Sequence, residues 1–297
     1  MNAGNVTRLV LLAALWGGSY LFIRIAAPVL GPILLMAARL SIAAVAMALY
    51  VSYRREPLKW RQNWKVYLAI GALNSAIPFT LIAFSTLTLP ASITSILIAT
   101  SPMFGALVAA LWFAERITVQ KAAGMVLGFV GVALMTGLGT LQMNAAVIGA
   151  TGASLIAALC YGIAGCMTRA YAKGCTSLQL ATGSQVTAAA LLLLLVPIAP
   201  LPAAFSTNIV MAVLVLGLFC TAFAYLLYFH LVTEVGPTSA LTVTYLVPLF
   251  GVLWGILFLH ESITAGMLLG GAVIVAGTVL VTSKQFSRGR NSMQSHR

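Results

Sequence analysis

Two glutamates and two arginines stand at the ends of strongly apolar stretches, where their charges could form ion pairs. Glu115 and Glu261 each follow an apolar run and shortly precede an Ile-Thr dipeptide, while Arg24 and Arg169 each close another run. A charge at the edge of a hydrophobic span costs free energy unless it is paired with an opposite charge or solvated by water. We therefore expect two pairs, Glu115–Arg169 and Glu261–Arg24, at opposite ends of the molecule. They could act as gates that open in turn; alternatively, both glutamates are static anchors, with Arg116 beside Glu115.

Arg39 is a charge that lies well inside an apolar stretch. It stands seven residues into the range 32–52, roughly 10 Å deep at the rise of an α-helix. Arginine does not lose its proton cheaply, so this side chain needs an acceptor. It could hold the carboxylate of a ligand, or it could brace its helix against backbone carbonyls or Glu261. Both possibilities stay open, and the matching stretch of the second half carries Ser184 and Gln185 instead.

Polar and aromatic side chains recur within the apolar stretches that would surround a central cavity. Asn74 and Gln185 cannot face lipid cheaply, and tyrosines inside a span need a partner for the hydroxyl. Each residue could serve packing alone. As a set they predict a neutral cavity with aromatic walls, which suits amino acids or other zwitterions better than phosphates. The candidate cavity residues are Trp16, Ser19, Tyr20, Arg39, Asn74, Phe79, Tyr161, Gln185, Tyr225, Tyr228, Thr242 and Tyr245.

Pro102 and Pro248 are expected near the middle of two apolar helices. Proline removes a backbone hydrogen bond and kinks a helix. Such a kink would free carbonyl groups at the depth of a substrate and provide a point of flexing. The alternative is a packing kink without motion.

The composition predicts an all-α integral membrane protein. Hydrophobic residues make up 61% of the chain and charged residues only 7%, against about 25% charged residues in soluble domains, and the mean hydropathy is +1.05. A spanning helix needs about 20 mainly apolar residues. Ten such ranges are expected: 7–28, 32–52, 66–87, 91–113, 120–138, 146–168, 177–197, 208–232, 237–259 and 265–282.

The distribution of Lys and Arg predicts the orientation of these ten helices. If the N-terminus is cytoplasmic, 14 of the 16 basic residues fall in cytoplasmic segments and none in external loops, as the positive-inside rule requires. The net charge of +12 is therefore interpreted as orientation, and no nucleic-acid partner is expected. The segment 284–297 is expected to be a basic cytoplasmic tail without regular structure that could contact anionic lipid.

The chain contains an internal repeat. Residues 102–136 and 248–282 align at an offset of 146 with 12 identical pairs in 35. The expected units are a first five-helix repeat, 1–138, and a second, 146–283. Because five is odd, the two units cross the membrane in opposite directions. Inverted repeats are typical of secondary transporters, whose substrate site lies at the repeat interface near the middle of the membrane.

Three sequence elements resemble the drug/metabolite transporter superfamily, specifically its EamA-type ten-helix exporters. They are the LWGGSYLFIR segment, the P-x-F-G…E-R-I-T element and its copy P-x-F-G…E-S-I-T. The resemblance covers residues 7–282. It implies a basket of helices around a central cavity, with the fifth and tenth helices peripheral. Similar members export amino acids and related metabolites, and others move sugars, nucleotide sugars or drugs.

We therefore expect a secondary transporter that exports neutral or aromatic amino acids across a prokaryotic inner membrane by alternating access. Alternatives are nucleosides, sugars or hydrophobic cations as substrates, or, less favoured, a channel. An enzyme is not expected, since the HExxH and GxSxG motifs are missing. No cofactor is expected and no metal site, because His230 and His260 would lie near opposite faces. The partners expected are the substrate and membrane lipid, and both monomer and dimer remain open.

Overall fold

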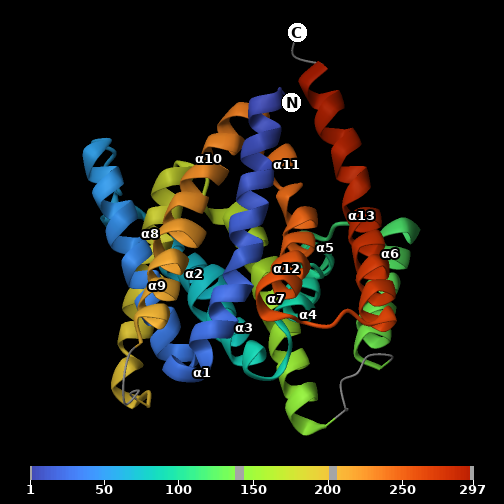
Figure 1. The fold of residues 1–297 in the computed structure, drawn as a ribbon. Helices are drawn as coiled ribbons and strands as arrows, with labels where there is room; N and C mark the ends of the chain where they lie inside the picture. Colours follow the sequence, from blue (N-terminus) through green and yellow to red (C-terminus); the bar gives the residue numbers. More distant parts are fainter. Residues whose placement is uncertain (1, 138–143, 201–205, 295–297) are drawn as a thin grey trace.

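The computed structural model describes residues 2–137, 144–200 and 206–294 and is helical throughout, with no strand in these ranges (Figure 1). The all-α prediction is thus confirmed. The helices are α1 (Ala3–Tyr53), α2 (Trp60–Gly71), the π-helix η1 (Ala72–Ala76), α3 (Ile77–Thr88), α4 (Ala91–Ile98), α5 (Ser101–Phe113), α6 (Val119–Gly137), α7 (Ala145–Tyr171), α8 (Ser177–Leu193), the 3-10 helix η2 (Val196–Ile198), α9 (Thr207–Gly217), the π-helix η3 (Leu218–Phe223), α10 (Ala224–Val235), α11 (Pro237–Ala240), α12 (Val243–Leu259) and α13 (Ala265–Gln294).

Seven helical runs of the described chain are long and apolar enough to cross a membrane, and α12 and residues 119–135 of α6 are shorter apolar helices. The first run, α1, covers two of the predicted ranges. They meet at Gly31, whose φ of 70° and ψ of 161° interrupt the helix. Glycine tolerates this positive φ, and the following Pro32 disfavours the helical conformation at the residue before it. The chain therefore reverses direction inside α1.

The predicted helix 91–113 is two helices in the structure, and Pro102 lies in the first turn of the second, which begins at Ser101. Thr100 and Ser101 each donate a side-chain hydrogen bond to a carbonyl three residues back, at 2.7 Å and 2.5 Å. Such bonds compete with the helical ladder. In the second repeat the break comes before Val243, so Pro248 lies inside the unbroken α12. The helix is therefore interrupted just before Pro102, whereas Pro248 lies within a continuous helix, so the two repeats differ at their matching prolines.

The ranges 66–87 and 208–232, predicted as spanning helices, each contain a π-helix, η1 or η3. The segment after 283 was expected to be irregular, yet α13 continues to Gln294; residues 295–297 lie outside the described residues. The helical continuation contains no proline, the residue that most disfavours a helix.

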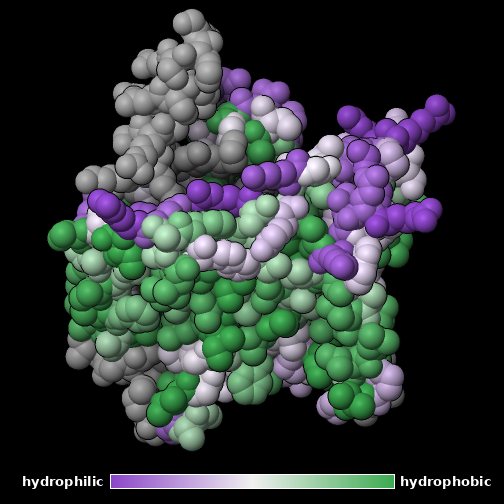
Figure 2. All heavy atoms as spheres, turned by 180° about the vertical axis from the view of Figure 1, so that it is seen from behind, coloured by the Kyte–Doolittle hydropathy of each residue, from purple (hydrophilic) through white to green (hydrophobic). Residues whose placement is uncertain are grey.

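The two ends of the described chain, in α1 and α13, lie at the same end of the molecule (Figure 1). We call this the basic end, because the α1–α2 turn and the start of α2 expose Arg54, Arg55, Lys59 and Arg61 there. Figure 2 shows hydrophilic surface gathered there above a broad hydrophobic band. The opposite end carries the turn within α1, the α3–α4 turn and the α12–α13 link. The largest buried apolar cluster joins α1 and α3 to α8 and α9.

Close glycine contacts relate the two repeats. A Cβ on Gly17 would lie 2.6 Å from Cβ of Phe250, and a Cβ on Gly162 would lie 2.7 Å from the backbone nitrogen of Gly105. At offsets of 145 and 146, Gly17 corresponds to Gly162, and Gly251, the neighbour of Phe250, corresponds to Gly105. The contact between α1 and α12 therefore has its counterpart between α7 and α5.

The peripheral helices α6 and α13 cross through two glycine pairs. A Cβ on Gly124 would lie 2.6 Å from the carbonyl oxygen of Gly277, and a Cβ on Gly270 would lie 2.6 Å from that of Gly131. An offset of 146 converts one pair into the other. Small residues let two membrane helices approach at backbone distance, and here they do so about an approximate twofold axis.

Candidate functional site

Arg39 lies in the buried interior, where only 3% of its surface is exposed. Its Nε donates to Oγ1 of Thr221 at 2.9 Å, and its Nη2 donates to Oγ of Ser19 at 3.4 Å. The guanidinium carbon stands 4.2 Å from the centre of the Phe79 ring, within the range of a cation–π contact. Three helical segments therefore position this cation: α1, η3 and α3.

A second polar group surrounds Tyr225. The Nδ2 of Asn74 donates to the Tyr225 hydroxyl at 2.9 Å, and Nε2 of Gln185 donates to Oγ of Ser75 at 2.9 Å. The Oε1 atom of Gln185 is buried without a hydrogen-bond partner. Asn74 and Ser75 both lie on η1, and Thr221, the partner of Arg39, lies on η3. The two π-helices thus supply polar contacts to both groups, as π-bulges often do at functional sites.

Aromatic rings lie beside these polar groups. The Trp16 ring lies 6.2 Å from Tyr225 and 5.6 Å from Tyr228, measured between centroids. Tyr20 is buried, and Tyr161 is half-buried against the same apolar cluster. Most of the predicted cavity residues are therefore brought to one interior region built from both repeats.

Two predicted cavity residues have contacts elsewhere. The Tyr245 hydroxyl is hydrogen-bonded to Oγ1 of Thr282 on α13, because α12 turns this face toward a peripheral helix. Thr242 donates its hydroxyl to the carbonyl of Ser239 at 2.7 Å, where the chain passes from α11 to α12. In this structure both side chains serve local contacts.

Glu261 and Arg24 were predicted to pair with one another, and in this structure each binds the α3–α4 turn instead. The Oε1 atom of Glu261 accepts the backbone N–H of Ala91 at 2.7 Å, and Oε2 accepts the N–H of Ser92 at 3.1 Å and its hydroxyl. Arg24 donates to the carbonyl of Thr86. An anion favours a helix N-terminus and a cation a helix C-terminus, so the free ends of α4 and α3 compete successfully with the ion pair.

At the basic end, Glu115 contacts Arg169, the partner predicted for it. Their Oε1 and Nη1 atoms are 2.5 Å apart, and Nζ of Lys121 lies 3.5 Å from Oε2 of Glu115. The guanidinium carbon of Arg169 stands 4.7 Å from the centre of the Phe113 ring. The hydrogen bond from Arg169 holds the pKa of the Glu115 carboxyl below its ordinary value.

The pH dependence of this contact is testable. A carboxyl whose pKa is lowered in the folded protein stabilises the fold above its unfolded pKa, and the contribution disappears as the pH falls through the folded pKa. We expect Arg169→Gln to lower the melting temperature by about 1–2 °C at neutral pH. The effect is small because 61% of the Arg169 side chain is exposed and exposed pairs contribute little. Melting curves should converge at acid pH; an unchanged difference would contradict the assignment.

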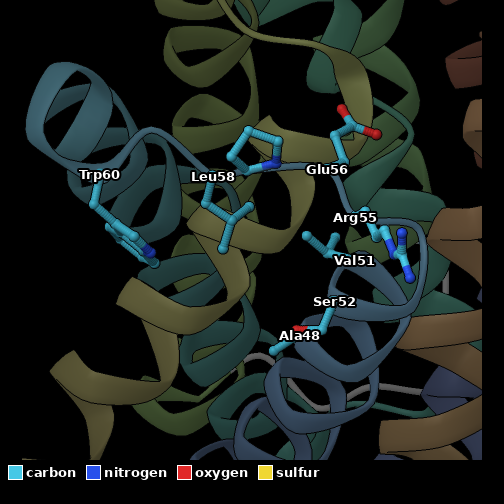
Figure 3. A pocket seen from close by; sticks show the side chains of 8 residues that line it. Ala48, Val51, Ser52, Arg55, Glu56, Leu58 and Trp60 are labelled. Atoms are coloured by element: carbon cyan, nitrogen blue, oxygen red, sulfur yellow. The ribbon is translucent and has the colours of Figure 1, made fainter.

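An open groove of about 400 Å³ lies at the basic end, between the end of α1 and the start of α2 (Figure 3). Its lining includes Val51, Arg55, Glu56 and Trp60. Val51 is 12 residues beyond Arg39 on the same helix, roughly 18 Å along its axis. This groove is therefore separate from the Arg39 region.

Several contributors to these contacts were not predicted. Ser75 and Thr221 bind the predicted Gln185 and Arg39, and both sit on π-helices that apolar periodicity does not reveal. Lys121 is a cation that follows Glu115 by six residues, so the sequence could have indicated it as a partner of Glu115. The N–H groups of Ala91 and Ser92 had no such signal, because every residue except proline has one.

The fold and these contacts define a helical membrane protein with two related halves and a buried polar centre. The chain belongs to the EamA-like transporter family, which matches residues 6–137 and 148–283. It is similar to an uncharacterized transporter of Archaeoglobus fulgidus, at 29% identity over 96% of this chain and 99% of the relative. It is also similar to a probable terminal-alkyne amino-acid exporter of Streptantibioticus cattleyicolor, at 26% identity over 97% and 96%.

A solved crystal structure shares the fold, with a TM-score of 0.66 over 95% of this chain and 97% of the other at 17% identity. This likeness extends over both repeats. It supports the helical architecture and, at this identity, nothing about the substrate.

Proposed function

We propose that this chain is a secondary transporter that exports neutral or aromatic amino acids by alternating access around the region of Arg39 and Tyr225. The observation that carries the proposal is the buried polar and aromatic centre, to which both repeats contribute. Transporter families built on inverted repeats place the substrate there. The probable terminal-alkyne amino-acid exporter among the relatives supports the same substrate class.

The proposed topology has ten spans, with both termini cytoplasmic in a prokaryotic inner membrane. The repeats are 1–138 and 146–283, and residues 284–297 form a cytoplasmic extension. The paired glycine contacts support a twofold relation between the repeats, and the exposed arginines and lysines of the basic end support a cytoplasmic position for that end.

We assign this structure to an inward-facing state. At the opposite end, α4 packs against α12, and Glu261 joins the second repeat to the α3–α4 turn of the first. Toward the basic end, α5 packs against α7, α6 and α13 instead. When the outer side, at the end opposite the basic end, opens, Glu261 and Arg24 would leave the turn, so these contacts would form the outer gate in place of the predicted Glu261–Arg24 pair. The Glu115–Arg169 pair is formed in the same state, so we do not assign it the role of an inner gate.

Counterflow into liposomes tests the transport proposal. Purified protein is reconstituted, the vesicles are loaded with unlabelled phenylalanine, and uptake of radiolabelled phenylalanine is measured with and without a pH gradient. We expect saturable uptake that internal substrate accelerates, since a carrier must reorient its site. Uptake without acceleration would favour a channel. If no neutral or aromatic amino acid enters, the substrate proposal fails and nucleosides, sugars and hydrophobic cations become the next panel.

A further inference from the structure

The chain has no acidic side chain available to balance Arg39. Its sequence contains four acidic residues, and all four lie in the described ranges. Each of them is engaged or located elsewhere: Glu56 binds Thr176, Glu115 pairs with Arg169, Glu261 binds Ala91 and Ser92, and Glu234 is exposed near the end of α10.

The contacts of Arg39 within the protein are neutral. Ser19 and Thr221 accept from it, and Thr221 in turn donates to the carbonyl of Leu216 at 2.8 Å. These bonds use two of the five N–H groups of the guanidinium. A buried cation without a counter-charge carries a large desolvation cost, and ionisable residues inside membrane spans mark functional sites. An anion from outside the chain would balance this charge.

A vacant acceptor lies near the same region. The Oε1 atom of Gln185, which is fully buried, has no hydrogen-bond partner. Tyr225 accepts a hydrogen bond from Asn74, interacts electrostatically with Arg39 and lies close to Gln185. The Tyr225 ring thus lies between the Arg39 guanidinium, which has no counter-charge, and the unpaired amide oxygen of Gln185. A ligand with a carboxylate at one point and an N–H donor at another would satisfy both.

We propose that Arg39 binds the carboxylate of the transported substrate and that Gln185 accepts from its amino group. The proposal rests on the proposed function and names the group that the site requires. A guanidinium binds a carboxylate through two parallel hydrogen bonds. It also repels a substrate that carries an ammonium group alone, so amines without a carboxylate are excluded.

The test uses the wild-type protein, so it does not depend on the folding of a variant. The melting temperature of the purified protein is measured with L-phenylalanine, 3-phenylpropionate, phenylalaninamide, phenethylamine and chloride. We expect L-phenylalanine to stabilise most and 3-phenylpropionate to stabilise in part. The amide and the amine, which lack the carboxylate, should have no effect. Stabilisation by the amine equal to that by L-phenylalanine, or by chloride equal to that by 3-phenylpropionate, would overturn the assignment.

Variants then locate the effect. Arg39→Met should weaken binding of 3-phenylpropionate by about 10- to 100-fold, the usual range for a charged hydrogen bond, and Arg39→Lys should retain part of it. Gln185→Leu should reduce the advantage of L-phenylalanine over 3-phenylpropionate. Arg61→Met, at an exposed position near the start of α2, is the matched control. If both Arg39 variants bind 3-phenylpropionate as the wild type does, Arg39 is not the carboxylate site.

The two proposals can fail separately. Binding of 3-phenylpropionate that requires Arg39, without transport of any amino acid, would retain the carboxylate site and reject amino acids as the substrate. Alternatively, L-phenylalanine could be transported while phenethylamine and phenylalaninamide inhibit its transport as strongly as carboxylates do. That result would support the transport function and reject the proposed role of Arg39.

Discussion

Gly17→Ala should destabilise this protein, although alanine is the better helix former. The added Cβ would lie 2.6 Å from Cβ of Phe250 and 2.9 Å from backbone atoms of α12. Real contacts are not this short, so α1 and α12 would have to separate. Overpacking of this kind costs about 1–3 kcal/mol. We expect a lower melting temperature and a lower yield of monodisperse protein in detergent.

The matched control is Gly165→Ala on α7. A Cβ at Gly165 would meet no atom within 4 Å, so the substitution should stabilise its helix by about 0.5–1 kcal/mol. Gly162→Ala, the counterpart of Gly17→Ala in the second repeat, should be destabilising as well, because its Cβ would lie 2.7 Å from the backbone nitrogen of Gly105. Equal melting temperatures for Gly17→Ala and Gly165→Ala would contradict the close approach of α1 to α12.

These glycines also show what the sequence could reveal. The repeat and the helical ranges follow from apolar runs and from identities at a fixed offset, signals that many residues carry jointly. Gly17 lies within the LWGGSY segment, but the sequence does not say which helix it contacts. A contact between two helices depends on how their surfaces pack in three dimensions, and a single sequence does not specify which surfaces pack together.

The charged residues illustrate the same limit. Glu115 was correctly expected to contact Arg169, because both were placed at the same end and few charges compete there. The predicted contact between Glu261 and Arg24 is not present in this structure, because the backbone amides of Ala91 and Ser92 bind the Glu261 carboxylate instead. A sequence indicates which side chains are charged and could pair. It does not indicate where a helix N-terminus offers free backbone N–H donors, because nearly every residue type has that group.

Glu261→Gln should open the outer side of the protein more often. The Glu261 carboxylate accepts hydrogen bonds from both backbone amides and the Ser92 hydroxyl. Glutamine keeps one acceptor, turns an NH2 group toward these donors and loses the charge that favours a helix N-terminus. A charged hydrogen bond contributes about 1.5–3 kcal/mol, so the population open to the outside should rise by about tenfold or more.

Alkylation of Cys220 measures this change. Cys220 is buried on η3 and interacts with Arg39 and Ser19, so a membrane-impermeant thiol reagent added outside reaches it only when the outer side opens. The modified cysteine is identified by mass spectrometry in right-side-out vesicles. Glu234→Gln, at an exposed position near the end of α10, removes a carboxylate without disturbing the α3–α4 turn and should react as the wild type does.

The direction of the change separates a gate from an anchor. If Glu261 only anchors the end of its helix, Glu261→Gln should lower stability without changing the rate at which Cys220 reacts from outside. If it holds the outer side closed, that rate should rise while L-phenylalanine still stabilises the protein, because the Arg39 region keeps all its contacts. Arg24→Gln, which frees the Thr86 carbonyl at the same turn, should act in the same direction as Glu261→Gln. An opposite effect of the two variants would show that Arg24 and Glu261 do not act on one closure.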